Sequence, residues 1–158
     1  MYVLWIGSDL YKGYHDPRSG RVDVIASRIG TVGRALAVQD FEIVVDEGGA
    51  LCNLALEVGD RESSAGLPER PATCVSAVDA EVEVVEEAGI RWCFEPRLGT
   101  LRVAFDGVEP ARWGRLGENL VWLALDAEAR LAALVVEGIS RDPGGKGQAA
   151  WLEELGVG

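Results

Sequence analysis

Apolar residues in this 158-residue chain recur at every second position of short segments, the period of a β-strand with one buried face. The clearest case is a predicted hairpin whose first strand points Phe41, Ile43 and Val45 to one side. After the loop DEGGA, its second strand returns with an apolar face at Cys52, Leu54, Leu56 and Val58. The pattern predicts a protein built from short antiparallel strands.

The chain also repeats itself. HDPRSGRVDVIAS, from His15, aligns with FEPRLGTLRVAFD, from Phe94, and the hairpin segment from Phe41 aligns with VWLALDAEARLAALVVEGISR, from Val121. Several identities are Pro, Gly, Asp and Arg, which are turn and edge residues, so we interpret the similarity as an internal repeat. Extended backwards, the same alignment places Val3 opposite Val82.

The repeat defines the predicted domain organisation. A unit of about 60 residues would bury roughly 60% of its unfolded surface and be marginal alone, so we expect the two units to share one core. We predict an α+β, predominantly antiparallel β fold, in which two repeated β-meander units form one pseudo-twofold domain with a C-terminal helix. The predicted boundaries are 1–61 for the first repeat, 62–79 for a linker, 80–141 for the second repeat and 142–158 for a loop and the helix.

The C-terminal helix is predicted from QAAWLEELGVG, in which Trp151, Leu152 and Leu155 form one apolar stripe and Gly156 can end the helix. Residues 79–90 could form a helix capped by Asp79, but their match to the first strand favours a strand. The second unit places Trp122, Ala124, Ala133 and Val135 on the outer face of its hairpin. We expect the terminal helix or another chain to cover this face.

Composition excludes several classes of function. The chain carries 26 Asp and Glu against 15 Lys and Arg, a formal net charge of −11, which disfavours direct binding to nucleic acid or to anionic membranes. No apolar run reaches the roughly 18 residues that span a bilayer, and no basic segment precedes the short apolar start, so we expect a cytoplasmic protein. Cys52, Cys74 and Cys93 form no CxxC pair and are expected to be reduced, mostly buried thiols.

Catalytic groupings are scarce. The one histidine, His15, leaves most zinc sites and Ser-His-Asp triads incomplete, and DPGGKGQ, residues 142–148, departs from the phosphate-binding loop pattern. The recurring carboxylates of Glu57 and Glu137 could meet across the pseudo-twofold axis as an acid–base pair, although edge-strand charges explain them more simply. We therefore expect no cofactor, no metal and no catalytic residue.

One family resemblance follows from the repeated pattern. Each unit has a turn containing Pro and Gly, a short strand, a variable loop, an apolar strand and then D-x(4)-L-x-x-L-x-x-E. Residues 16–61 and 95–141 thus resemble, in tandem, the bacterial family called domain of unknown function 2283. The resemblance implies a small antiparallel β fold and no established catalytic or ligand residue. The second loop, DAEAR, lacks the family's glycine, so we expect a different turn around Ala129.

Acidic residues that do not recur between the units are the best candidates for function. We predict that a cationic partner binds at these acids, with Trp122 as an aromatic anchor: Glu42, Glu47, Asp60, Glu81, Glu83, Glu86 and Glu87. The leading hypothesis is a non-enzymatic, acidic protein-interaction domain, in its most specific form an immunity or antitoxin-type partner of a basic protein. Two alternatives are a small-molecule-binding or enzymatic domain using Glu57, Glu137 or His15 at the repeat interface, and a self-assembling β-protein in which a homo-oligomer forms.

Overall fold

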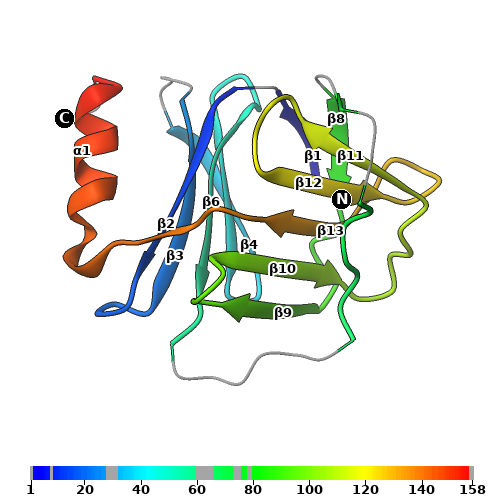
Figure 1. Cartoon of the computed structure of the whole chain (residues 1–158). Helices are drawn as coiled ribbons and strands as arrows, with labels where there is room; N and C mark the ends of the chain where they lie inside the picture. Colours follow the sequence, from blue (N-terminus) through cyan, green and yellow to red (C-terminus); the bar gives the residue numbers. More distant parts are fainter. Residues whose placement is uncertain are drawn as a thin grey trace.

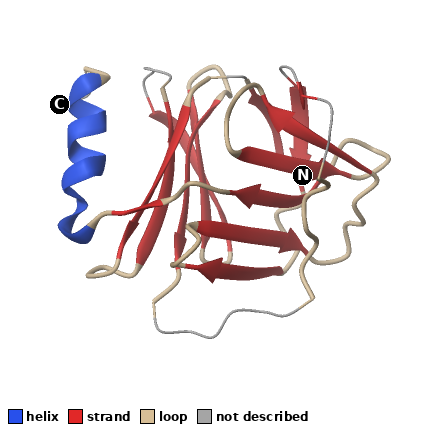
Figure 2. Ribbon diagram, in the orientation of Figure 1, coloured by secondary structure: helices blue, strands red, loops and turns tan. Residues whose placement is uncertain are grey.

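A computed structural model describes residues 2–7, 9–27, 32–59, 66–72, 76–77 and 80–156. In these residues, strands are joined by tight turns and one helix lies near the C-terminus (Figures 1 and 2). The first-unit elements are β1 (Tyr2–Ile6), β2 (Tyr11–Asp16), β3 (Arg21–Ala26), β4 (Val32–Val38), β5 (Phe41–Asp46) and β6 (Leu51–Glu57), followed by β7 (Ser76–Ala77). The second-unit elements are β8 (Ala80–Val84), β9 (Ile90–Glu95), β10 (Thr100–Phe105), β11 (Arg112–Leu116), β12 (Val121–Leu125) and β13 (Leu131–Val136), followed by β14 (Ser140–Arg141), the 3-10 turn η1 (Pro143–Gly145) and α1 (Lys146–Glu154).

The two units have the same topology. One sheet has the strand order β14-β2-β3-β6-β5-β4, and the other has the order β7-β11-β12-β13-β10-β9. Strands β2 to β6 therefore match β9 to β13 one for one, with all their mutual pairings antiparallel. The predicted fold class, a mainly antiparallel β protein of two repeated units with a C-terminal helix, is confirmed.

Two contacts mark the pseudo-twofold axis, because residues at equivalent positions can touch only near it. β1 and β8 pair antiparallel with Leu4 opposite Val82, and the rings of His15 and Phe94 lie 4.7 Å apart between centroids. Leu4 and Val82 both face the core, whereas Val3 is 52% exposed. The predicted equivalence of Val3 and Val82 is therefore wrong by one residue, since it would align an outward position with an inward one.

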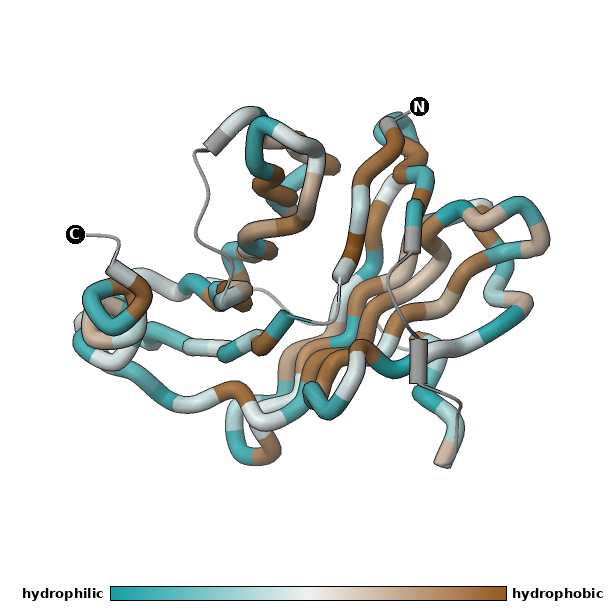
Figure 3. Tube along the Cα trace, turned by 90° about the horizontal axis from the view of Figure 1, so that it is seen from above, coloured by the Kyte–Doolittle hydropathy of each residue, from teal (hydrophilic) through white to brown (hydrophobic). Residues whose placement is uncertain are grey.

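The shared core lies between the two sheets, where the apolar positions of the strands gather (Figure 3). In both hairpins the strand register shifts just after the turn, so that Val45 pairs with Leu51 and Leu125 pairs with Leu131. Such a bulge turns the following side chain to the other face of the sheet. Leu51 is consequently buried in place of Cys52, which the sequence placed on the core side and which is half-buried.

The β5–β6 and β12–β13 hairpins are closed by the same aspartate-capped turn. The Asp46 carboxylate accepts hydrogen bonds from the backbone N–H groups of Gly48 and Ala50, at 2.9 Å each. The Asp126 carboxylate accepts the equivalent bonds from Glu128 and Arg130, at 2.9 and 2.8 Å. Ala129 adopts the left-handed conformation, φ 62°, that Gly49 adopts at φ 84°. The prediction of a different turn in the second unit is wrong, because Asp126 imposes the geometry even on alanine.

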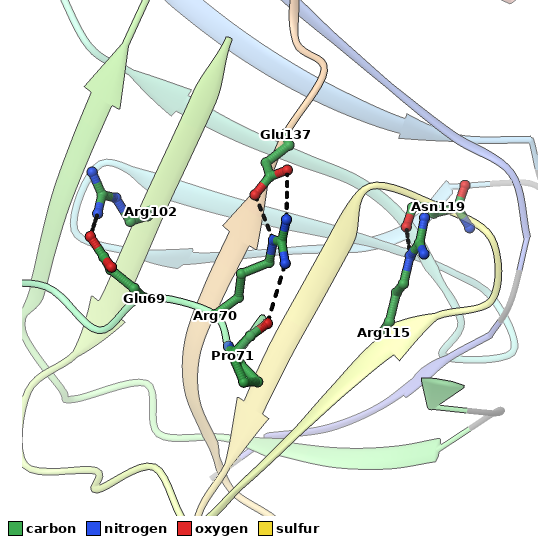
Figure 4. A network of polar contacts seen from close by, with 7 residues as sticks. All are labelled: Glu69, Arg70, Pro71, Arg102, Arg115, Asn119 and Glu137. Carbon is green, nitrogen blue, oxygen red and sulfur yellow. Dashed lines mark hydrogen bonds and ion pairs between the residues drawn. The ribbon is translucent and has the colours of Figure 1, made fainter. Parts of the chain in front are cut away.

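The outer face of the second sheet is covered by residues 66–72, a segment we call the strap (Figure 4). The Arg70 guanidinium lies 4.1 Å from the Trp122 ring centroid and forms an ion pair with Glu137 at 2.6 Å, and Glu69 pairs with Arg102 at 3.1 Å. The expectation that α1 or another chain covers this face is therefore wrong. The helix instead lies beside β2 of the first unit, where Trp151 packs under the Lys12 ammonium at 3.9 Å.

Each sheet is completed at one edge by a short parallel strand. β14, at the end of the second unit, pairs parallel with β2 of the first, and β7, which follows the first unit, pairs parallel with β11 of the second. Both pairings cover a strand that would otherwise be an open edge. Unpaired edges invite contact with other chains, so these short strands protect the fold.

Two hairpins reach across the unit boundary at equivalent places. The buried Asn119, between β11 and β12, accepts a hydrogen bond from the Tyr11 backbone N–H at 2.9 Å and donates to the carbonyls of Asp9 and Leu116 at 2.6 and 2.9 Å. Gln39, between β4 and β5, accepts one bond from the Ile90 N–H at 3.3 Å. Tyr11 and Ile90 begin the equivalent strands β2 and β9, so the two amides form a reciprocal pair of latches.

Candidate protein-binding surface

The ribbon formed by β1 and β8 carries exposed apolar side chains. The segment YVLWI has apolar residues on both faces of β1, so burying Leu4 and Ile6 in the core turns Val3 and Trp5 outward. Val3 is 52% and Trp5 38% exposed. On β8 the outward positions are acidic, because Glu83 lies opposite Val3 and Glu81 lies opposite Trp5. The ribbon therefore presents aromatic and apolar surface directly beside two carboxylates.

Two hairpins extend this surface on either side. The Trp5 backbone N–H donates to the Gly49 carbonyl at 2.9 Å, which holds the β5–β6 turn, the turn that contains the exposed Glu47, beside β1. The Glu83 N–H donates to the Ala129 carbonyl at 3.1 Å, which holds the β12–β13 turn and Glu128 beside β8. We call the surface formed by Val3, Trp5, Glu47, Glu81, Glu83 and Glu128 the ribbon face. It lies on the opposite side of the molecule from α1 (Figure 1).

The electrostatics of the ribbon face are strongly negative. Arg130, a cation beside this face, is engaged by Asp126 at 2.6 Å and by Glu128 at 3.6 Å. Burial raises the pKa of Asp126, but hydrogen bonds from the Arg130 and Glu128 backbones and from the Arg130 side chain outweigh it, so the pKa lies below its ordinary value. This carboxylate stays ionised at neutral pH and holds Arg130 inside the turn, where Arg130 also interacts electrostatically with the half-buried Glu83. Glu47 and Glu81 are exposed.

The structure brings together part of the predicted site. Glu47, Glu81 and Glu83 lie on the ribbon face, and Glu86 and Glu87 lie in the turn directly after β8. Glu42 lies on β5, where its carboxylate is 3.8 Å from the Arg21 guanidinium. Asp60 lies outside the described residues. The ribbon face thus combines acids predicted from the sequence with two apolar residues, Val3 and Trp5, that were not predicted to bind a partner.

Trp122 is a correction. It was predicted as an exposed aromatic anchor, but it is 4% exposed, with Arg70 on its ring at 4.1 Å and Arg115 at 5.2 Å. Because the strap already fills this position, Trp122 stabilises the fold rather than presenting a binding surface. The same cover removes the motivation for self-assembly, which depended on an open apolar face here.

The groups considered for catalysis have separate partners. Glu137 binds Arg70 through both carboxylate oxygens, whereas Glu57 lies at the end of β6, opposite Arg21 in the strand register. His15 packs edge-on against Phe94, and burial, followed by the charge of Arg141, lowers the pKa of its imidazole despite the opposing effect of Asp16. A neutral, packed imidazole beside a phenyl ring is a structural arrangement.

In comparisons with family models, curated proteins and solved structures, nothing matches this chain. The resemblance to domain of unknown function 2283 therefore stays a prediction that depends on the repeated turn and the D-x(4)-L-x-x-L-x-x-E pattern. Within the described residues, no helix is both long enough and apolar enough to cross a membrane.

Proposed function

We propose that this protein is a non-enzymatic interaction domain whose ribbon face binds a basic protein. The observation that carries the proposal is the exposed Trp5, which lies opposite Glu81 in the strand register, with Glu83 two residues further along β8 and Glu47 in the adjacent β5–β6 turn. Interface anchors are typically aromatic residues, and surrounding charges select a partner of opposite sign. A partner presenting a shallow apolar pocket rimmed by Lys or Arg fits this surface.

Net charge supports the same partner class. A chain at −11 produces a long-range field that accelerates encounter with a cationic protein and repels polyanions. Neutralising a basic toxin, or masking a nucleic-acid-binding surface, requires no catalytic group and suits a small, rigid β domain. The immunity or antitoxin role is the most specific form of this proposal, and we place the encounter in the cytoplasm.

The test is affinity capture from lysate of the native organism with three purified proteins. The wild-type chain is compared with E81K/E83K, which reverses two charges on the ribbon face, and with E153K/E154K, which makes the same charge change on the exposed surface of α1. We expect a basic protein to be retained by the wild type and by E153K/E154K, and to be lost from E81K/E83K. Retention should weaken as salt rises, because exposed charges are screened within about 8 Å at physiological ionic strength.

A further variant separates apolar anchoring from charge. Trp5→Ala should weaken retention at both low and high salt, because the indole contributes to binding by burying apolar surface and not by electrostatic attraction. Equal retention by E81K/E83K and E153K/E154K would contradict a ribbon-face site, and recovery of acidic or neutral partners alone would contradict the proposed partner class.

A further inference from the structure

A groove of about 460 Å³ lies at the boundary between the two units, away from the ribbon face. It is bounded on one side by Leu10 to Tyr14, at the start of β2, and on the other by the 118–121 turn and residues 136–140. Its floor is apolar, with Val24, Val121 and Val136. Its size falls in the range typical of small-molecule sites, roughly 300–1,000 Å³, and its position between two packed units is also typical.

The groove exists because the units differ at one core-facing position. Gly13 of β2 is equivalent to Trp92 of β9, since these strands align from Tyr11 and Ile90 onward. Trp92 is 9% exposed and fills the core of the second unit with an indole. At Gly13, Ile139 occupies the space nearest the backbone, because an added Cβ would lie 2.8 Å from its Cγ1. The remaining space is the groove, so the first unit holds a vacancy where the second holds an aromatic ring.

The edge of β2 that borders the groove is already capped. The Asn119 side chain accepts from the Tyr11 N–H, and β14 pairs with Tyr14 and His15. A peptide strand added at this edge would need the Tyr11 backbone N–H as a hydrogen-bond donor, but this group already donates to the Asn119 side chain. These contacts favour a compact ligand over an extended peptide.

Charges around the groove define the ligand's polar group. Lys12 is held over the Trp151 ring at 3.9 Å, and Glu137 is neutralised by Arg70 at 2.6 Å. Among the charged groove residues in the described part of the chain, Glu118 is the exposed carboxylate that no cation engages. Exposed Leu10 and Leu120 flank the entrance, at 52% and 46% exposure. The combination offers a ring-sized space above a floor of valines and, at its rim, the Glu118 carboxylate.

We propose that this groove binds a small arylalkylamine, whose ring takes the place that Trp92 takes in the second unit and whose ammonium faces Glu118. The proposal is independent of the ribbon face, because Val3, Trp5, Glu81 and Glu83 do not line the groove.

The experiment is an NMR titration of the full-length ¹⁵N-labelled protein with three probes that share an indole: tryptamine, 3-methylindole and indole-3-propionate. Tryptamine should shift the backbone amides of Gly13, Leu120 and Gly138 and should bind more tightly than either other probe. Glu118→Gln should weaken tryptamine binding by about two- to fivefold, the effect of one exposed ion pair, and leave 3-methylindole unchanged.

Two further variants keep the test decisive. Leu120→Ala should weaken all three probes, because it removes apolar contact rather than charge, and Glu128→Gln should change none, because this acid lies on the ribbon face. Tighter or equal binding of indole-3-propionate would overturn the assignment of the ammonium group. Shifts outside the groove, or no saturable shift with any probe, would overturn the site itself.

Discussion

The two units share a topology but differ in how they are held together at the boundary between them. The Asn119 latch of the second unit is buried and makes three hydrogen bonds to the backbone, whereas the equivalent Gln39 latch makes one, at the surface. The four-residue turn 117–120 replaces the two-residue turn 39–40 and brings Asn119 inward. The strand pairing common to both units therefore determines the architecture. The length of one turn determines which of the two latches holds the units together more strongly.

Removing the two latches should show this difference most clearly. Asn119→Ala should lower the free energy of unfolding by about 2 to 3 kcal/mol, because the Tyr11 N–H and the Asp9 and Leu116 carbonyls lose a buried partner. Gln39→Ala should cost less than about 0.5 kcal/mol, as is usual for exposed positions. Urea unfolding of both variants measures how much free energy of unfolding each loses. Equal losses would show that the two latches are energetically equivalent.

The paired turns provide a second comparison, with effects of opposite sign. Ala129→Gly should stabilise the protein by about 0.5 to 1 kcal/mol, because glycine adopts a positive φ without the strain that an L side chain incurs. Gly49→Ala should destabilise it by a similar amount, and this effect is purely conformational, since an added Cβ at Gly49 meets nothing within 4 Å. Thermal unfolding should resolve both changes as shifts of about 1 to 4 °C. A stabilising Gly49→Ala would refute the shared-turn explanation.

The axial pair gives the smallest expected effect, and it depends on pH. The pKa of His15 is lowered in the fold, so the unfolded chain takes up a proton at a higher pH than the folded chain does. Stability therefore falls as the pH drops through about 6.5, the ordinary histidine value. His15→Phe, which copies Phe94, removes this loss, so the variant should gain stability relative to wild type at pH 5 compared with pH 8. Denaturant midpoints at the two pH values provide the measurement, and an identical difference at both would exclude the titration.

The repeat could be predicted from the sequence because its strongest identities lie in turns, where chemistry is specific. Asp46 and Asp126 cap equivalent loops, and Gly20 and Gly99 both adopt positive φ after the Pro-containing turns. β4 and β11 were missed, since each contains a glycine, Gly33 or Gly114, that interrupts an already weak apolar alternation.

The binding surface was only partly predictable. Glu47, Glu81 and Glu83 do not recur between the units, unlike the framework acids; Glu81 and Glu83 lie on one face of β8, and Glu47 lies in the turn held beside β1. Val3 and Trp5 could not be assigned to solvent, because an uninterrupted apolar segment does not reveal which face is buried until its partner strand is known. The burial of Trp122 could not be predicted, because the strap that covers it lies about 50 residues away in sequence and has no periodic pattern of apolar residues.

The pairing of β14 with β2 ties the two halves of the chain together. A first half cut off before β7 would lose β14 from its sheet and expose backbone donors and acceptors along β2, whereas the second half would keep β7 and its complete sheet. The first unit therefore depends on the end of the second unit to complete its sheet. Unfolding should accordingly proceed as one cooperative transition, and proteolytic nicking of the linker should leave the two fragments associated.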